Sequence, residues 1–363
     1  RFLNPRLSYL SDPFLLAGMD KAVSRVREAI QRRERIVVFG DYDVDGLTGT
    51  TLLRQIIQLQ GGDVEAFVPD RLTDGYGVTT GALTRCLAQY HPSLAITVDC
   101  GTGAAEGVAM ARAAGCDMIV TDHHQPGETA SGALVELNPK LGNHPELEGL
   151  AGVVVAFKLA HALIKRGLQE GSSAASALDL REWLDLVALG TIADVVPMTG
   201  ENRILARHGL ACMEKGKREG LRALCAVAGL KKEITSYHVG FVLGPRLNAA
   251  GRLGDARRAL DLLMTSDPGT SVRLASELDK MNSERKTTED TTLAAAAAQA
   301  ETFPPAEREM GMVVSGEGWH AGILGIVAAR LSGRYNCPAV VIAMDSNGLG
   351  RGSARTSSDV DLM

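Results

Sequence analysis

Residues 36–121 alternate between short apolar runs and longer amphipathic stretches. The apolar runs predict buried strands at 36–39, 64–68, 94–98 and 117–121. The stretches between them have helical spacing and predict helices near 48–60, 79–89 and 103–114. Short strands that alternate with helices indicate a parallel sheet that is covered by helices on both faces.

The rest of the chain is mainly helical until a second, smaller α/β pattern begins. Residues 1–35 predict a loop and then a helix, and apolar helices are expected at 150–164 and 183–192. Residues 266–302 have the charged, alanine-rich pattern of one long helix. Beyond it, strands at 312–315 and 338–343 flank a helix at 323–332. We therefore predict an α/β protein with a larger parallel-sheet domain, a connector helix and a smaller α/β domain, separated by a cleft. The predicted bounds are 1–265, 266–302 and 303–363.

Polar side chains follow each predicted strand of the larger domain. In chain order they are Asp41, Asp43 and Asp45; Arg71, Asp74 and Tyr76; Asp99; and Asp122, His123 and His124. Ligands of open parallel sheets bind at the carboxyl ends of the strands. A single aspartate after a strand is usually a helix cap. Four successive strand ends with polar groups are harder to explain by capping, so we expect them to form one site.

Asp41, Asp43 and Asp45 alternate without a nearby lysine, so they would repel one another unless a cation lies among them. The alternative is a solvated acidic loop. A calcium-binding loop would need a glutamate at its twelfth position, which is Leu52 here. Aspartate and histidine suit Mn²⁺ or Mg²⁺, and six scattered cysteines argue against structural zinc. Asp194, in an apolar run, needs either the metal as a partner or a capping role near Pro197.

The composition is that of an ordinary globular protein, with 45% hydrophobic and 22% charged residues. Aromatic residues make up only 4%, so a platform for stacking bases must be small. No apolar run could span a bilayer and no signal peptide opens the chain, so we expect a cytoplasmic protein with reduced cysteines.

The charge is unevenly distributed although the net value is only −5. Residues 41–200 carry 9 Lys and Arg against 20 Asp and Glu, whereas residues 201–260 carry 12 against 5. An acidic half could hold cations and a basic segment could hold phosphates. The alternative is that both are solvated helix faces.

Two later segments combine arginines with small residues. Arg246 and Arg252 flank a predicted loop of glycine, asparagine and alanine, and Arg351 and Arg355 lie in a glycine- and serine-rich stretch at 350–358. Arginine makes bidentate contacts to phosphate, and small residues let a backbone approach closely. His320 beside Trp319 is either structural or part of a site, and both interpretations stay open.

Four motifs in this order resemble the DHH phosphoesterase superfamily. They lie at 41–46, 98–101, 121–124 and 190–197. A finer similarity, to RecJ-type exonucleases, rests on residues 12–16, 74–77, 189–197, 244–253 and 319–320. The resemblance implies 5′→3′ hydrolysis of single-stranded DNA to mononucleotides, in repair and recombination, with two Mn²⁺ or Mg²⁺ ions. It also implies that the domains are the DHH domain and its associated domain.

The resemblance also implies roles for particular residues. The metal ligands would be Asp41, Asp43, Asp45, Asp99, His123 and Asp194, with Asp99 between the ions. His124 would face the scissile phosphate and act with Asp99 and Arg246. The groups that hold substrate would be Arg71, Tyr76, Asn248, Arg252, His320, Ser353 and Arg355. Expected partners are single-stranded DNA, a single-strand-binding protein and a RecQ-type helicase; we expect a monomer with no membrane contact.

Three departures limit the resemblance. Cys100 stands where relatives often have asparagine, and residues 353–356 read Ser-Ala-Arg-Thr instead of Ser-Gly-Arg-Ser. The sequence also ends before the family's Gly-Gly-His segment and OB-fold domain, so we expect a fragment that could hold metal and yet cut poorly. Alternatives are an oligonucleotide or cyclic-dinucleotide phosphodiesterase, a pyrophosphatase, or a non-catalytic scaffold. The basic segment favours a longer polyanion, and the complete ligand set argues against a dead site.

Overall fold

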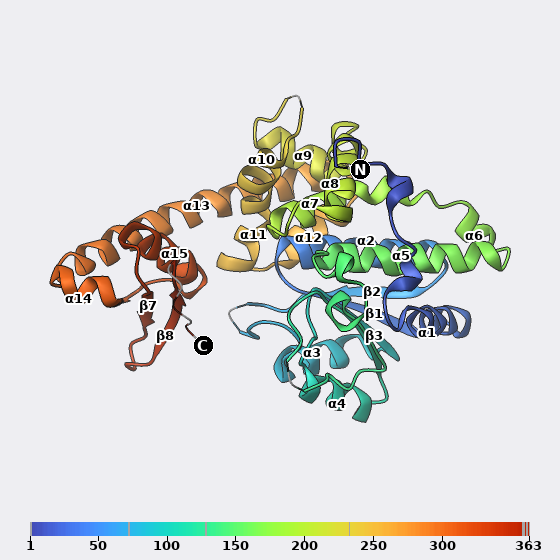
Figure 1. Ribbon diagram of the computed structural model, residues 1–363, viewed down its shortest axis with the longest axis horizontal. Coiled ribbons are helices and arrows are strands. Elements are labelled where there is room, and N and C mark those ends of the chain that lie inside the picture. Colours follow the sequence, from blue (N-terminus) through green and yellow to red (C-terminus); the bar gives the residue numbers. More distant parts are fainter. Residues whose placement is uncertain are drawn as a thin grey trace.

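The computed structural model describes residues 2–71, 73–127, 129–231, 233–357, 360 and 362, apart from the side chain of Glu307. A large body built on one sheet and a small body built on another are joined by the long helix α13, Pro268–Ala300 (Figure 1). The long helix that was predicted over residues 266–302 is confirmed. Across the described part of the chain, every helix is too short or too polar to cross a bilayer.

The large sheet has five parallel strands in the order β2-β1-β3-β4-β5. The strands are β1 Arg35–Gly40, β2 Asp63–Phe67, β3 Leu94–Val98, β4 Asp117–Thr121 and β5 Val135–Leu137. The first four confirm the predicted strands. The fifth escaped prediction because it is only three residues long, with a glutamate in the middle.

Helices cover both faces of this sheet, as the alternation predicts. On one face lie α1 Met19–Arg32, α2 Val44–Leu59 and α5 Gly152–Gln169; on the other lie α3 Thr80–Tyr90 and α4 Ala105–Ala113 (Figure 1). The residues of β1 divide between two cores accordingly. Ile36 and Val38 pack with α1, α2 and α5, whereas Val37 and Phe39 pack with α3 and α4. All carboxyl strand ends therefore meet at one edge.

A helical layer continues the large body. It consists of α6 Ser173–Ser176, α7 Leu184–Ala193, α8 Gly200–Glu214, α9 Glu219–Val227, α10 Ser236–His238, a π-helical turn at Val239–Leu243, α11 Gly244–Leu253 and α12 Arg257–Met264. The predicted loop at 244–254 is wrong, because these residues form α11. The small residues serve close packing instead. A Cβ at Gly251 would lie 3.1 Å from the carbonyl oxygen of Tyr42, on the loop after β1.

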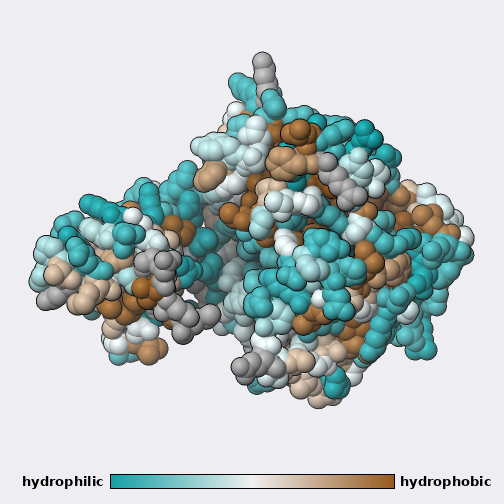
Figure 2. All heavy atoms as spheres, in the orientation of Figure 1, coloured by the Kyte–Doolittle hydropathy of each residue, from teal (hydrophilic) through white to brown (hydrophobic). Residues whose placement is uncertain are grey.

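The small body has a three-stranded sheet in the order β6-β7-β8. Its elements are α14 Pro305–Met310, β6 Met312–Glu317, α15 Leu324–Tyr335, β7 Ala339–Met344 and β8 Gly350–Arg355. Residues 350–355, in the glycine- and serine-rich stretch, form β8 and pair antiparallel with β7. The core of the small body includes Ala296, Ala297 and Ala300 at the end of α13. The space-filling view shows a recess between the two bodies (Figure 2).

The basic segment is less basic in three dimensions than in sequence. Six of its cations form salt bridges, five of them with carboxylates outside residues 201–260. These pairs are Lys217–Glu182, Arg218–Asp185, Arg222–Glu219, Arg246–Asp279, Arg257–Asp261 and Arg258–Glu277. The charge count of this segment therefore supports a polyanion-binding surface less than the sequence suggested.

Candidate metal centre

The loop after β1 places three aspartates in different local environments. The helix expected from Thr48 begins four residues earlier, at Val44, because Asp43 is its N-cap. The Oδ1 atom of Asp43 accepts hydrogen bonds from the backbone N–H groups of Asp45 (2.9 Å) and Gly46 (3.0 Å). Asp41 thus lies beyond the strand end, Asp43 caps α2, and Asp45 lies in the first turn of α2.

Asp45 is held by the N-terminus of α5. Its Oδ2 accepts from the N–H of Gly152 at 2.7 Å and its Oδ1 accepts from the N–H of Val153 at 2.9 Å. Exposed N–H groups and the helix dipole favour a negative charge at this point. Glycine is required at the contact, since a Cβ at residue 152 would lie 2.7 Å from Oδ1 of Asp99. The first turn of α5 therefore fixes two acidic groups at once.

His123 lies at the centre of the remaining acidic groups. Its Nε2 atom is 3.1 Å from Oδ1 of Asp99, 3.6 Å from Oδ2 of Asp194 and 3.9 Å from Oδ2 of Asp45. Three groups have donor atoms within 4.8 Å of one another: Asp99, His123 and His124; Asp45, His123 and Asp194; and Asp41, Asp43 and Asp99. The structure thus brings together all six residues predicted as ligands.

Several donor atoms in this cluster are buried without a hydrogen-bond partner among the described residues. They are Oδ1 of Asp41, Oδ1 of Asp99, Nε2 of His123 and Oδ2 of Asp194. Unpaired buried polar atoms are costly, and here they point at one another. Carboxylate oxygens with one imidazole nitrogen are the donor set that Mn²⁺ or Mg²⁺ accepts. The residues therefore fit a divalent metal.

The pKa values express the same mutual repulsion. Burial and the charge of Asp43 raise the pKa of Asp41 to about 8 and that of Asp194 to about 6. Burial, together with neighbouring aspartates, also raises the pKa of Asp45 and of Asp99 well above the ordinary value. Burial and the adjacent His124 lower the pKa of His123 to about 4, which leaves its ring neutral. A cation would reverse the penalty on the carboxylates.

His124 is oriented by its neighbour Asp122, which the sequence analysis left without a role. Oδ1 of Asp122 lies 2.7 Å from Nδ1 of His124 and accepts from the backbone N–H of His124 at 3.1 Å. Although burial opposes it, hydrogen bonds from His124 and Thr102 lower the pKa of Asp122 to about 2. The same contact raises the pKa of His124. Asp122 therefore holds the ring in place and favours its protonated form.

A further layer of residues, also missed from sequence, fixes the loop that carries both histidines. Nδ2 of Asn138 donates to the carbonyl oxygen of His124 at 2.9 Å, and Nζ of Lys140 donates to that of His123 at 2.5 Å. Both residues follow β5, the strand that was not predicted. Because that strand was not predicted, no sequence pattern indicated that residues 138–140 lie beside the histidines.

A cavity of about 290 Å³ opens beside the cluster. It is lined by Asp41, Tyr42, Asp43, Arg71, Tyr76, Ala193, Asp194, Asn248 and Arg252. Four predicted substrate-binding residues, Arg71, Tyr76, Asn248 and Arg252, are thus at the site. The Arg71 guanidinium lies over the ring of Tyr42, and burial, with the charges of Arg71 and Arg285, lowers the pKa of Arg252 to about 10. The cavity thus combines two arginine cations with three aspartate carboxylates, which suits the binding of an anionic ligand next to a metal ion.

Two of these lining residues also have structural contacts. Oδ1 of Asn248 accepts from the N–H of Val44 at 3.1 Å, which ties α11 to the start of α2. The hydroxyl of Tyr76 donates to the carbonyl oxygen of Asp99 at 3.3 Å and lies 3.2 Å from Nδ1 of His124. Tyr76 nevertheless remains 51% exposed, so part of its ring is open to a ligand.

Arg246, predicted as catalytic, and the other predicted substrate-binding residues lie outside this cavity. Nε of Arg246 pairs with Oδ1 of Asp279 at 2.9 Å. His320 caps a short turn, its Nδ1 accepting from the N–H of Gly322 at 3.1 Å. Ser353 and Arg355, on β8, lie against the start of α15, where a Cβ at Gly325 would be 3.2 Å from each of them. Their predicted contacts with phosphate stay predictions.

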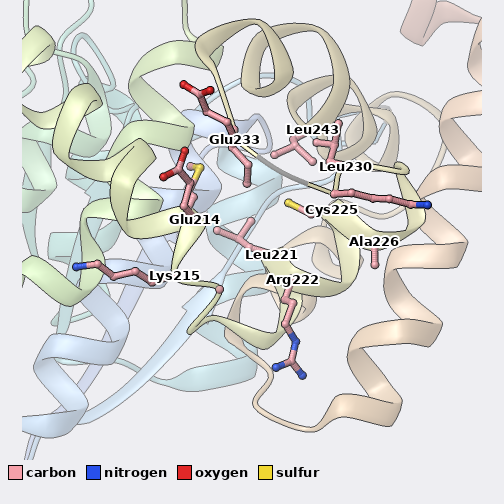
Figure 3. A pocket seen from close by; sticks show the side chains of 13 residues that line it. Glu214, Lys215, Leu221, Arg222, Cys225, Ala226, Leu230, Glu233 and Leu243 are labelled. Atoms are coloured by element: carbon pink, nitrogen blue, oxygen red, sulfur yellow. The ribbon is translucent and has the colours of Figure 1, made fainter.

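A larger cavity, of about 770 Å³, lies between α8, α9 and the π-helical turn (Figure 3). Figure 3 shows that Leu221, Leu230 and Leu243 line this cavity, with Cys225 beside them. Among the described residues, none of the three groups that could hold a metal ion lies in this larger cavity. The chemistry of the molecule is therefore concentrated in the smaller cavity.

A parallel α/β sheet with a carboxylate and histidine cluster at its carboxyl edge, next to cations, defines a metal-dependent phosphoesterase type of site. A family model for the "DHH family, N-terminal domain" matches residues 35–191. The single-stranded-DNA-specific exonuclease RecJ of Bacillus subtilis is 38% identical over 99% of this chain and 44% of its own length. RecJ of Escherichia coli K12 is 38% identical over 94% of this chain and 60% of its own length.

Solved structures agree with these relatives. The crystal structure of an exonuclease RecJ bound to manganese superposes with a TM-score of 0.84 at 35% identity, covering 98% of this chain and 86% of the other. RecJ of Thermus thermophilus in complex with Mn²⁺ gives 0.83 at 34% identity, covering 99% and 49%. The chain belongs to the DHH family, in its RecJ-type branch. It spans 44% to 64% of the length of the first curated relatives it matches.

Proposed function

We propose that this chain is the catalytic part of a metal-dependent exonuclease that hydrolyses single-stranded DNA from its 5′ end to mononucleotides. The observation that carries the proposal is the convergence of four unpaired buried donor atoms, on Asp41, Asp99, His123 and Asp194, beside a cavity with two arginines. Solved structures of similar RecJ proteins in complex with Mn²⁺ and with Mg²⁺ support the same metals here.

Two divalent ions would be held by six side chains, those of Asp41, Asp43, Asp45, Asp99, His123 and Asp194. Asp99 would be shared, because it belongs both to the group with His123 and His124 and to the group with Asp41 and Asp43. When bound, such ions supply positive charge at the scissile phosphate and make a water molecule more acidic. The protein positions these charges without large rearrangement, because strand ends and helix N-termini already fix the ligands.

The remaining groups act on the substrate directly. Arg71 and Arg252 face the cavity and would neutralise the phosphate. His124, which Asp122 holds at Nδ1, would turn Nε2 from the Tyr76 hydroxyl, 3.2 Å away in the free protein, to a phosphate oxygen and give it a hydrogen bond or proton. The exposed part of Tyr76 would stack on a base, worth about 1–3 kcal/mol. Arg246 would contact phosphate only after exchanging its present partner Asp279.

The smaller domain would supply the end-selecting contacts. Ser353 and Arg355 lie at the N-terminal end of α15, where backbone N–H groups favour an anion. His320 lies two residues before Gly322, which touches the carbonyl oxygen of the cavity residue Arg252. We divide the chain at 1–265, 266–302 and 303–363, so that α13 spans the two substrate-binding parts.

The biological setting belongs to the same proposal. We infer a monomeric cytoplasmic protein of DNA repair and recombination that works on strands opened by a RecQ-type helicase and covered by a single-strand-binding protein. The support is the similarity to curated proteins named single-stranded-DNA-specific exonucleases. Co-sedimentation of this chain with each candidate partner, with and without DNA, tests the association.

The activity test is Mn²⁺-dependent release of nucleotides from single-stranded DNA labelled at either end. We expect mononucleotides first from the 5′-labelled end, no cleavage of blunt duplex, and no activity after chelation or in Asp99→Asn. Pyrophosphate and a cyclic dinucleotide are run beside it. Turnover of only these small substrates would make the phosphodiesterase alternative correct. DNA binding without any turnover would favour a scaffold.

A further inference from the structure

Val195 has a backbone conformation that its side chain disfavours. It follows Asp194 at the end of α7 and has a φ of 62°, in the left-handed region. The other described non-glycine residues with positive φ are Arg33, His91, Asp99 and Asn336, none of which is branched at Cβ. A β-branched residue in this region is a genuine outlier, because its side chain crowds the backbone. Glycine or asparagine would adopt the same turn with less strain.

Packing within the protein does not account for valine at this position. The side chain is 84% exposed, and Val195 belongs to none of the hydrophobic cores, whereas Ala193 and Val196 on either side pack against the main core. The backbone N–H of Val195 donates to the carbonyl oxygen of Ile192 at 3.3 Å, a contact that any residue except proline could make. The strain and the exposure of this apolar group are therefore both uncompensated in the free protein.

The position of Val195 relative to the catalytic cavity is specific. Ala193 and Asp194 line that cavity, and Oδ2 of Asp194 lies 3.6 Å from Nε2 of His123. Tyr76, which also lines the cavity and whose hydroxyl lies 3.2 Å from Nδ1 of His124, is 51% exposed. Val195 therefore adds a second exposed apolar side chain, directly after two residues that line the cavity.

We propose that Val195 is a substrate-contacting residue whose methyl groups pack on the base of a nucleotide held at the metal centre, beside Asp194. The inference rests on the proposed function and adds a residue to it. The left-handed turn directs the side chain out of the core and into solvent, where a ligand can cover it. Because such a contact is apolar and non-directional, it would bind all four bases alike.

Three variants separate the contact from the backbone conformation. Val195→Asn and Val195→Gly keep the turn and remove the apolar surface, whereas the matched control Val195→Ile keeps both the strain and the apolar surface. KM, kcat and the dissociation constant are measured on a 5′-phosphorylated single strand and on the same strand with its first three nucleotides abasic. Mn²⁺ affinity, measured by titration, shows whether Asp194 has moved.

We expect Val195→Asn and Val195→Gly to raise KM and the dissociation constant about 5- to 10-fold on the normal strand, as partial exposure of a valine-sized contact would. On the abasic strand they should equal the wild type, and Val195→Ile should equal it on both. Mn²⁺ affinity should be unchanged. The melting temperature of Val195→Asn should rise by roughly 1–3 °C, because strain is relieved.

Two results would overturn the inference while leaving the proposed function intact. One is wild-type binding of the normal strand by Val195→Asn. The other is an equal loss on normal and abasic strands, which would mean that the substitution acts through Asp194 and not through a base. A wild-type chain that neither binds nor cleaves the normal strand would overturn both. A wild-type chain that binds without cleaving still decides the question through the dissociation constants.

Discussion

The acidic cluster of the large body and the predicted phosphate-binding residues of the small body are built differently. On the large-domain side, acidic ligands are fixed by strand ends, a helix cap and the N-terminus of α5, and Asp41, Asp45 and Asp99 are each no more than 2% exposed. On the small-domain side, Ser353 is half-buried and Arg355 is exposed on the edge strand β8, and Nη1 of Arg355 donates to Oγ of Ser353 and to the carbonyl oxygen of Ala354. The first side is preorganised; the second depends on where the small domain sits.

Two contacts that involve none of the predicted metal ligands help to hold the small body in place. At the junction with α11, Gly322 lies so close to Arg252 that a Cβ would be 2.0 Å from the Arg252 carbonyl oxygen. Along α13, the buried carboxylate of Glu289 bridges Arg285 of its own helix (2.5 Å) and Arg330 of α15 (2.9 Å). Substitutions should therefore be able to damage metal binding and DNA-strand binding separately.

The largest effect is expected from Asp99→Asn, which removes the carboxylate shared by two ligand groups. We expect turnover to fall on the order of 10³-fold and Mn²⁺ affinity to collapse, because charge stabilisation at the phosphate is lost. The metal-free protein should nevertheless melt at a higher temperature than the wild type, since one buried like charge is gone. The control is Asp63→Asn, at the amino end of β2, because the predicted metal ligands lie at the carboxyl ends of the strands. A lower melting temperature than the wild type would contradict the account of repulsion.

The second prediction separates the two adjacent histidines. His123→Ala removes the ring whose Nε2 contacts three carboxylates, so both metal affinity and turnover should be lost. His124→Ala should reduce turnover by about 10²–10³-fold and leave Mn²⁺ binding largely intact. Asp122→Asn, which loosens the His124 ring, should cost about 10- to 100-fold in turnover. Calorimetric titration with Mn²⁺ measures binding, and equal losses of binding in both histidine variants would refute the division.

The proximity of these residues could be predicted because topology alone decides where they lie. Apolar strands such as β3 are unambiguous, and parallel strands bring their carboxyl ends to one edge, so Asp99 and His123 had to meet. Local conformation was harder. The small residues at 244–254 are compatible with a loop and also with a helix that packs closely against a neighbouring segment. The close approach of Gly251 to Tyr42 distinguishes the two.

Salt-bridge partners on different helices were not predictable from the sequence. The basic segment could not show that Arg218 pairs with Asp185, because that carboxylate lies on a preceding helix. The left-handed backbone conformation of Val195 was also not predictable from sequence, since valine disfavours that conformation. Sequence thus specified the preorganised side of the site and left the substrate-facing side under-determined.

The third prediction concerns pH. Asp41 has a folded pKa of about 8 against an ordinary value of 3.8, so between these values the folded state binds more protons than the unfolded state. The stability that depends on this proton is complete at low pH and is lost as pH rises toward 8. His123 acts oppositely between about 4 and 6.5, because its folded pKa is lowered, so the fall should be clearest from pH 6.5 to 8.

Melting temperatures in chelator at pH 6.5, 7.0, 7.5 and 8.0 measure this fall, and Asp41→Asn should flatten it. With Mn²⁺ present the trend should reverse, because metal binding displaces the proton and its affinity rises by up to about tenfold per pH unit below 8. A metal-free wild type whose melting temperature is constant over this range would mean that the carboxylates are already ionised without a cation.

The smallest effect tests the other side of the comparison. Gly322→Ala places a methyl group against the Arg252 carbonyl oxygen and should tilt the small domain away from the cavity without touching a metal ligand. We expect KM for a 5′-phosphorylated strand to rise about tenfold, since misplacement of remote binding groups weakens orientation. Mn²⁺ affinity and hydrolysis of a small chromogenic phosphodiester, which needs only the large domain, should stay unchanged.

The matched control for this junction is Gly333→Ala, in α15 of the same small domain, where an added methyl group meets open space. It should leave the KM for the strand at the wild-type value. If Gly322→Ala also lost Mn²⁺ affinity or small-substrate turnover, the two sides of the site would be mechanically coupled, and the small domain would have to be counted among the elements that preorganise the metal centre. If its KM stayed at the wild-type value, the strand would be held by the large domain alone, and the predicted phosphate contacts of Ser353 and Arg355 would be wrong.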